Sequence, residues 1–170
     1  MVEKPDAGDI VDLETVKIDF TDTAHDVFGK VTDAAAAVVR RAWPRLRDGV
    51  ASRTPMDLKA GSYFGGRKPA DGHIDWEQSA VQIYNLIRGV THPYPGAFTF
   101  LDGTKITVWS AWPVDGSGTP GSIQSQSPLR IATGKGLLEI KSLQLESEPE
   151  MTAEDFISRC NTCTAFDNSR

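Results

Sequence analysis

The sequence predicts an α+β protein in which a small Greek-key β-barrel of the OB type follows a strand and a long helix. Three observations carry this prediction: apolar residues alternate before position 21, helical periodicity spans residues 24–47, and five short strand-like segments follow position 96. Five short strands with one helix at each end suit a small closed barrel.

Composition is typical of an ordinary globular chain. Charged residues make up 24%, hydrophobic residues 39%, and the net charge is -5 over 170 residues. Such a chain can bury the core of one or two small domains and is neither disordered nor membrane-spanning. The acidic balance argues against a nucleic-acid-coating role, and the N-terminus lacks the apolar core of a secretory signal. We therefore expect a cytoplasmic protein without membrane contact, and nucleic acid is an unlikely partner.

The first 50 residues predict a strand followed by a helix. Apolar residues alternate from Val16 to Phe20, as in a strand. Thr23 then offers a helix cap, and apolar residues recur at spacings of three and four through Leu46, with Gly49 ending the helix. Residues 51–75 are punctuated by glycine and proline and are predicted to be a linker.

The second half predicts a helix, a run of strands and a closing helix. The helix spans about 79–89, and Pro93–Gly96 stops it. Asp102-Gly103 predicts a hairpin turn, and Thr152 with Asp155 predicts the cap of a helix over 151–159. The predicted strands are 97–101, 105–111, 121–126, 129–132 and 137–145.

Three blocks of sequence resemble a known family. They are MVEKPDAGDIV, GRKPADGHIDWEQSAVQIYNLIRGVTHPYPGAFT and GKGLLEIKSLQLESEPEMTAEDF. Together they are similar to the C-terminal portion of 10-formyltetrahydrofolate-dependent formyltransferases. The wording IYNLIRGVTHPYPGAF is closer to sugar-nucleotide formyltransferases, aminoarabinose formyltransferase especially, than to methionyl-tRNA formyltransferases.

The resemblance implies a division of the chain. Residues 1–50 would be the last strand and helix of a Rossmann-like catalytic domain, 51–75 a linker, 76–160 the OB-like C-terminal domain, and 161–170 a tail. The rest of the catalytic half would lie upstream of Met1. The orphan strand and apolar helix face would then need cover, from a second copy or from a separate catalytic-domain chain.

The resemblance also implies site residues. Asp6 matches the family's catalytic aspartate, and Val2, Glu3, Lys4, Pro5 and Asp6 match a stretch that lines the folate pocket. The family's histidine and asparagine lie in an N-x-H segment that this sequence lacks, so the chain alone is expected to be inactive. Judged from the residues alone, a turn residue before Gly8 is the favoured interpretation of Asp6.

Asn85 and Arg88 are candidate substrate-binding residues, because they lie three apart on one helix face. They could meet a nucleotide phosphate, or pair with a carboxylate such as Asp75 or Glu77. Four aromatic residues could stack on a base but are more typical of a core: Trp76, Tyr84, Tyr94 and Phe98. No metal is expected. Cys160 and Cys163 form a lone CxxC, for which two reduced thiols are the favoured interpretation over a metal or redox site.

Two classes of function follow. The first is formyl transfer from 10-formyltetrahydrofolate to a primary amine of a sugar nucleotide, by an enzyme of which this chain is the C-terminal part. The alternative is a stand-alone OB-like binding or structural module for a sugar nucleotide, RNA or a partner protein, since OB-folds often bind oligonucleotides and oligosaccharides. A fragment of a methionyl-tRNA formyltransferase or a truncated reading frame is a further alternative.

Overall fold

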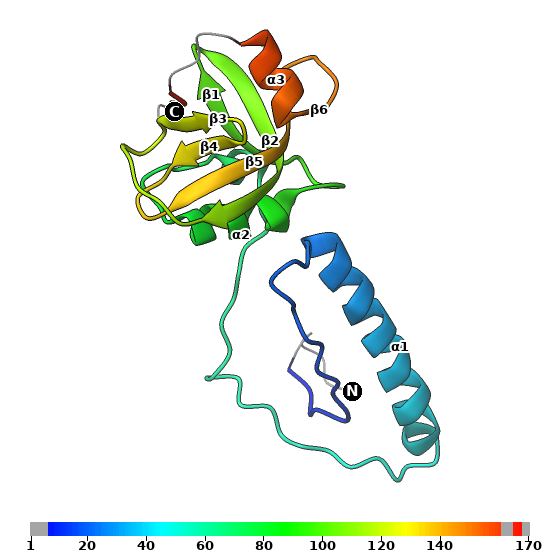
Figure 1. Cartoon of the computed structure of the whole chain (residues 1–170). Coiled ribbons are helices and arrows are strands. Elements are labelled where there is room, and N and C mark those ends of the chain that lie inside the picture. Colours follow the sequence, from blue (N-terminus) through cyan, green and yellow to red (C-terminus); the bar gives the residue numbers. More distant parts are fainter. Residues whose placement is uncertain (1–6, 161–164, 168–170) are drawn as a thin grey trace. The chain divides into compact units, whose positions relative to one another are not determined.

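The computed structural model describes residues 7–160 and 165–167, and the chain divides into two compact units (Figure 1). Unit 1 comprises residues 1–66 and unit 2 comprises residues 67–170. The division falls earlier than the end of the linker predicted at residue 75. Ile74 has no exposed surface and belongs to the core of unit 2, so hydrophobic burial assigns this part of the predicted linker to the second unit.

Unit 2 is built on a six-stranded antiparallel sheet, which confirms the predicted fold class. The strands follow the order β1-β2-β5-β4-β3, and β6 pairs with β5. Non-consecutive neighbours such as β2 and β5 are the mark of a Greek-key arrangement. The bounds are β1 Ala97–Leu101, β2 Thr104–Val114, β3 Ile123–Gln126, β4 Leu129–Ala132, β5 Leu137–Leu145 and β6 Met151–Thr152.

The hairpin between β1 and β2 turns where the sequence predicts it. Asp102 and Gly103 have φ values of 49° and 79°, which fit the left-handed backbone that a two-residue hairpin requires. Leu101 therefore lies opposite Thr104, and Ala97 lies opposite Val108. This register sends Ala97, Leu101 and Val108 to the same buried core.

Residues 165–167 join the two edges of the sheet. The amide of Asp167 donates to the carbonyl of Phe100 at the β1 edge (2.8 Å), and the amide of Phe166 donates to the carbonyl of Gly121 ahead of β3 (2.9 Å). Phe166 is 4% exposed and packs beside Trp76 and Phe156. This segment, which the sequence places in a tail, covers backbone edges that would otherwise be unpaired.

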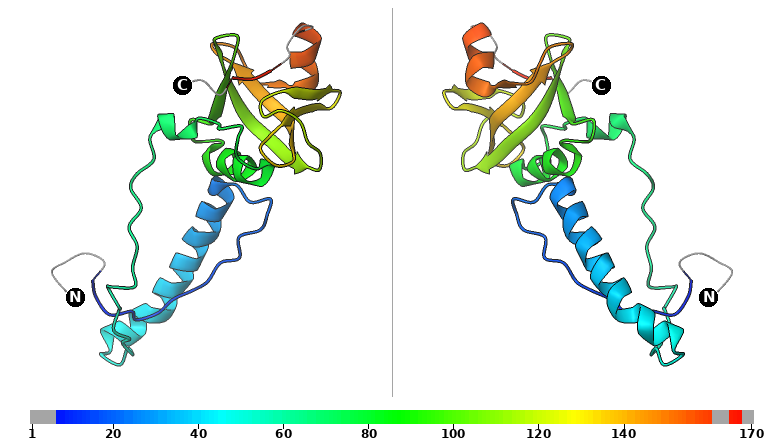
Figure 2. Two further views of the ribbon diagram at one scale, coloured as in Figure 1. Left: turned by 90° about the vertical axis from the view of Figure 1, so that its left-hand side faces the viewer. Right: turned by 90° about the vertical axis from the view of Figure 1, so that its right-hand side faces the viewer.

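Helices close the two ends of the curved sheet (Figure 2). α2 (Ala80–Val90) lies at one end and α3 (Ala153–Arg159) at the other, and the short 3-10 helix η1 spans Pro69–Gly72. Ser79 caps α2 and Thr152 caps α3 by accepting the amide hydrogen of the third residue beyond. Ile83 and Ile87 of α2 and Phe156 of α3 lie in the core, each at most 2% exposed.

Unit 1 contains the predicted long helix but not the predicted strand. α1 spans Ala24–Arg47, and Thr23 and Asp26 form its capping box. Residues 11–19 carry no strand, and the residue before them, Ile10, makes an isolated bridge with Thr54. The alternation from Val16 to Phe20 is real, but a strand exists only where a neighbouring strand supplies hydrogen bonds.

A row of apolar side chains on α1 is exposed. We call this row the α1 stripe; its side chains are 42–64% exposed, at spacings of three, eight, four and three: Phe28, Val31, Val39, Trp43 and Leu46. By contrast, Ala42 on the same helix is 6% exposed. Among the described residues of unit 1, Ala42 is thus the one buried side chain, while a single helix carries a long exposed apolar surface.

Candidate functional site

The predicted catalytic and folate-pocket residues lie outside the described residues. Val2, Glu3, Lys4, Pro5 and Asp6 all precede Ala7, the first residue that the structure describes. Their roles therefore stay predictions. The chain immediately after them is held by paired backbone hydrogen bonds between Ile10 and Thr54, at 2.8 and 2.9 Å.

Asn85 and Arg88 lie together on α2, as their spacing predicts. The guanidinium Nε of Arg88 donates to Oδ1 of Asn85 at 2.8 Å, and its Cζ lies 5.8 Å from the centre of the Tyr84 ring. Asn85 is exposed and Arg88 is half-buried. One N–H donor of the Arg88 guanidinium is thus bonded to Asn85. The face of the Tyr84 ring beneath the guanidinium attracts its positive charge.

The aromatic residues considered for base stacking separate into two groups. Trp76 is fully buried and donates from Nε1 to Oγ1 of Thr99 at 3.0 Å, and Tyr84 is 6% exposed. Both belong to the core, as their type favoured. Tyr94, at 41%, is exposed, and Phe98 lies half-buried under Nζ of Lys105, 4.4 Å from the ring centre.

Trp112 was missed by reasoning from the sequence. It is 39% exposed on β2 and makes an edge-to-face contact with Tyr84, with ring centres 5.4 Å apart. Trp112 therefore extends the surface of Asn85 and Arg88 onto the sheet. Its outward direction follows from its place next to the buried Ala111, which a strand alternation would have indicated.

Glu139 is a buried carboxylate that the sequence did not single out. It lies on β5 opposite Arg130 of β4, accepts from Nε of Arg130 at 2.9 Å, and also accepts from Nζ of Lys141. Hydrogen bonds from Lys141 and then Arg130 outweigh burial and hold the pKa of Glu139 below its usual value. The group is thus an ionised anchor between two cations, unsuited to donating a proton at neutral pH.

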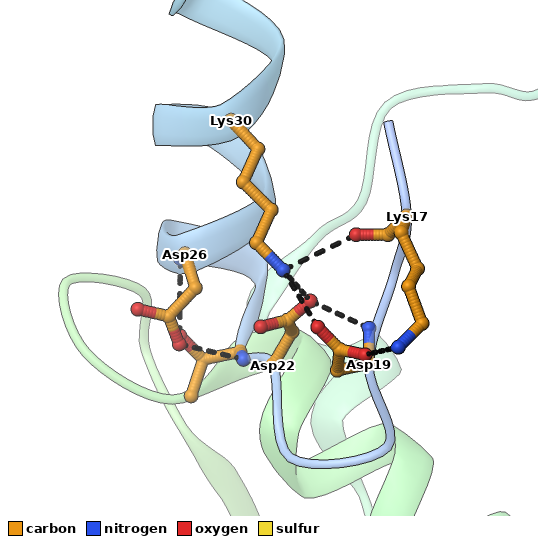
Figure 3. Close-up of polar contacts among 6 residues, drawn as sticks. Lys17, Asp19, Asp22, Asp26 and Lys30 are labelled. Carbon is orange, nitrogen blue, oxygen red and sulfur yellow. Dashed lines mark hydrogen bonds and ion pairs between the residues drawn. The ribbon is translucent and has the colours of Figure 1, made fainter. Parts of the chain in front are cut away.

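An ion-pair network lies at the N-terminal end of α1 (Figure 3). Nζ of Lys30 reaches Oδ2 of Asp22 at 2.5 Å and Oδ2 of Asp19 at 3.2 Å, and Lys17 pairs with Asp19 at 2.5 Å. Hydrogen bonds from these lysines lower the pKa of Asp19, and that from Lys30 lowers the pKa of Asp22. The network is exposed to solvent, so its contribution to the free energy of unfolding is small. It holds the segment before α1 against the first turns of that helix.

The three histidines lie in separate environments. His25 is exposed in the first turn of α1. His73 packs edge-on against Phe98, with ring centres 5.3 Å apart, and its buried Nε2 has no partner among the described residues. His92 stacks on Trp109 and lies 3.1 Å from Glu150. None of these pairings joins a histidine to a neighbouring asparagine in the part of the chain that the structure describes.

Cys160 corrects one prediction. It is disulfide-bonded, whereas the sequence favoured reduced thiols; Cys163 lies outside the described residues. A CxxC spacing does not distinguish thiols from a disulfide, because that depends on local geometry and redox environment.

Within residues 7–160 and 165–167, no group of three or more His, Cys, Asp or Glu residues could hold a metal ion. None of the helices in that part of the chain is both long and apolar enough to cross a membrane.

Comparison with known proteins places unit 2 in a family. Residues 67–161, more than half of the chain, match the family model described as "Formyl transferase, C-terminal domain".

Comparison with solved structures extends the similarity of fold to most of the chain. HypX from Aquifex aeolicus, in a multiply substituted variant, aligns with a TM-score of 0.68 and 19% identity over 94% of this chain. HypX in complex with tetrahydrofolic acid gives a TM-score of 0.66 and 20% identity over 93% of this chain. The chain spans 29% and 28% of the length of these two proteins. At this level of identity the likeness concerns the fold.

Proposed function

Because the chain belongs to the formyl transferase C-terminal domain family, we propose that it is the C-terminal part of an enzyme that transfers a formyl group. The proposed donor is 10-formyltetrahydrofolate and the proposed acceptor is a primary amine of a sugar nucleotide. The match of residues 67–161 to the family is the observation that carries this proposal. The fold shared with HypX, one structure of which holds tetrahydrofolic acid, supports folate as the donor.

The proposed chemistry is acyl transfer. The amine nitrogen attacks the formyl carbon, the bond from that carbon to N10 of the folate breaks, and the proton lost by the amine passes to N10. Asp6 would stabilise the imidazolium that forms when a neutral histidine takes up the proton of the amine, and an asparagine would stabilise the oxyanion. In the family that the chain resembles, that imidazole and that asparagine belong to an N-x-H segment that these 170 residues do not contain. The proposed turnover therefore involves a second body, a catalytic part beyond these residues.

Unit 1 offers the surface for that second body. A groove of about 440 Å³ runs between residues 9–12 and the C-terminal half of α1, and a second groove of about 320 Å³ continues past Val16 toward Val31. Both grooves are lined by Val38 and Val39. An extended segment without strand partners beside an apolar helix face fits the edge of a β-sheet, which would supply hydrogen bonds and apolar cover together.

The surface of Asn85, Arg88 and Trp112 is the proposed contact for the nucleotide part of the acceptor. A guanidinium is suited to a phosphate, and an exposed indole is suited to a base. In the same proposal the enzyme works in the cytoplasm, where folate-dependent one-carbon transfer takes place in the family it resembles.

Reconstitution tests the proposed function. The chain is mixed with the isolated catalytic half of a sugar-nucleotide formyltransferase, and formyl transfer to an amino-sugar nucleotide is measured against transfer to aminoacyl-tRNA. We expect activity with the mixture, none with this chain alone, and a preference for the sugar nucleotide. The matched control is Val39→Asp, which places a charge in both grooves and should abolish reconstitution while leaving unit 2 folded.

Two results would count against the proposal. Preference for aminoacyl-tRNA would move the acceptor to the methionyl-tRNA branch and leave formyl transfer standing. Failure to restore activity with a folded chain, together with a rise in melting temperature on adding a nucleotide sugar or oligonucleotide, would favour a stand-alone binding module instead.

A further inference from the structure

The segment before α1 runs antiparallel to that helix, and two basic side chains of α1 bind it (Figure 2). Arg41 donates from Nε and Nη2 to the carboxylate of Asp12, at 2.8 and 2.9 Å, and from Nη2 to the carbonyl of Leu13 at 3.2 Å. Nearer the start of the helix, Nζ of Lys30 donates to the carbonyl of Lys17 at 3.1 Å (Figure 3). The backbone of the segment is therefore bound to α1 at two points.

The distance between these two points fits an extended backbone. Lys30 and Arg41 are eleven residues apart on α1, which is about 16 Å along a helix that rises about 1.5 Å per residue. The chain from Leu13 to Lys17 advances by four residues, and four residues span at most about 14 Å. A segment whose carbonyls meet both side chains is thus close to fully extended.

The side chains of the segment alternate as they do in a β-strand. Asp12 and Glu14 both pair with Arg41, at 2.8 and 2.9 Å, and Val16 lines one of the two grooves along α1. Leu13, between the two carboxylates, is 64% exposed. Every second side chain from 12 to 16 thus faces the helix, which is the period of a strand. The segment has the conformation of a strand, without a partner strand among the described residues.

One backbone edge of this strand is occupied. Successive residues of a strand direct their N–H and C=O groups to opposite edges. The carbonyls of Leu13 and Lys17, which are four residues apart, therefore lie on the same edge, and a cation of α1 is bonded to each. We call this the closed edge; it comprises the backbone groups of residues 13, 15 and 17. The two cations along it block the approach of a neighbouring strand.

The opposite backbone edge, which we call the open edge, is unoccupied. It comprises the N–H and C=O groups of Glu14, Val16 and Ile18, which make no backbone hydrogen bond within the described residues. Unpaired groups of this kind are a template for another strand. A strand with one closed edge accepts a single neighbour, so pairing ends after one strand and does not continue from chain to chain.

The second body of the proposed function fits the open edge better than a second copy of this chain does. The HypX variant that shares the fold aligns over 94% of this chain, and the chain spans 29% of that protein, so the fold occurs there within a larger body. Two copies would each bring a net charge of -5, and their residues 9–19 would each bring four carboxylates and one lysine. Self-pairing therefore places like charges side by side.

We infer that residues 12–19 are a preformed edge strand, which joins a β-sheet of the second body through the open edge while Arg41 and Lys30 keep the closed edge occupied. This inference rests on the proposed function for the identity of the partner. The backbone groups of residues 14, 16 and 18 form the ladder with the neighbouring strand. Binding is favoured because the segment is already extended and loses little further backbone freedom.

Amide hydrogen exchange tests the inference. The isotope-labelled full chain is observed by NMR before and after adding the unlabelled catalytic half of a sugar-nucleotide formyltransferase. We expect the amides of residues 14, 16 and 18 to exchange at least about tenfold more slowly in the mixture, because they enter a ladder. The amides of residues 15 and 17 lie on the closed edge and should change by less than about twofold.

Two matched pairs of variants separate the two edges. Ile18→Pro removes an N–H from the open edge and should abolish the protection of residues 14 and 16, whereas Thr15→Pro removes one from the closed edge and should preserve it. Arg41→Gln releases the segment and should weaken binding of the catalytic half by at least about fivefold. Arg45→Gln is its control, because Arg45 lies on the same helix and donates to Oγ of Ser52 at 3.0 Å.

The results that would overturn the inference are distinguishable from a failure of the proposed function, because formyl transfer is measured in the same mixture. Formyl transfer with protection at residues 15 and 17 instead, or with none in the segment, would reject the open edge and leave the proposed function standing. Protection of residues 14, 16 and 18 that rises with the concentration of this chain alone would make a second copy the partner. Neither protection nor formyl transfer would contradict both.

Discussion

The two units use apolar residues in opposite ways. In unit 2 they come from distant segments and cover one another: Ile74, Leu138 and Leu143 have no exposed surface. In unit 1 they lie along one helix, and Phe28, Val39 and Trp43 are each more than 60% exposed. Both units have correct local signals, including caps and periodicity. The difference teaches that periodicity produces a helix, while burial requires a second surface of matching shape.

Phe166→Ala is the substitution expected to damage unit 2 most. The ring is 4% exposed and fills the space beside Trp76 and Phe156, so truncation should lower the free energy of unfolding by about 4 kcal/mol. Chemical denaturation followed by tryptophan fluorescence measures this. The matched control is Asp167→Asn. Asp167 is exposed and joins the sheet through its backbone, so this substitution should hardly change the free energy of unfolding. Equal effects of the two variants would show that residues 165–167 are not part of the core of unit 2.

Gly134→Ala tests the close approach of two backbone segments in unit 2. A Cβ at this position would lie 1.8 Å from the carbonyl oxygen of Glu77, so the chain must shift, at a cost of about 3 kcal/mol. The control is Gly89→Ala on α2, where a Cβ meets nothing within 4 Å and helix propensity favours alanine by up to about 1 kcal/mol. Denaturation midpoints should therefore move in opposite directions, and a neutral Gly134→Ala would contradict the packing of this loop.

Glu139→Gln tests the buried ion cluster on β4 and β5. At pH 7 the variant should be less stable by about 2 kcal/mol, because Arg130 and Lys141 lose their anion. Since the pKa of Glu139 is lowered by folding, its contribution is present above the ordinary carboxyl range and is lost as pH falls through the lowered pKa. Melting temperatures of the two proteins should converge as pH approaches 3. A gap that stays constant with pH would exclude the ionic origin.

Val39→Asp should have the smallest effect on the stability of the chain alone. Val39 is 62% exposed, so a charge there should change the free energy of unfolding by less than about 0.5 kcal/mol. Ala42→Asp, one turn away at 6% exposure, is the matched control and should cost several times more. Light scattering on both variants sharpens the comparison: if a second copy covers the α1 stripe, Val39→Asp converts a dimer into a monomer.

Much of unit 2 could be predicted from its sequence. The hairpin at Asp102-Gly103, the cap at Thr152, and the strand at 129–132 all follow from local chemistry that tertiary contacts did not override. Asn85 and Arg88 likewise share a face because helical spacing requires it. These predictions succeeded because each depends on residues within about four positions of one another.

The sequence by itself determined the helices, the turns and the family to which the chain belongs. Tertiary structure alone decided three matters: that residues 11–19 remain without strand partners, that residues 165–167 join β1 to the segment before β3, and that Glu139 of β5 pairs with Arg130 of the neighbouring strand β4. The physical reason is common to all three. A strand, an edge and an ion pair each depend on a partner distant in the chain, and no local pattern specifies where that partner lies.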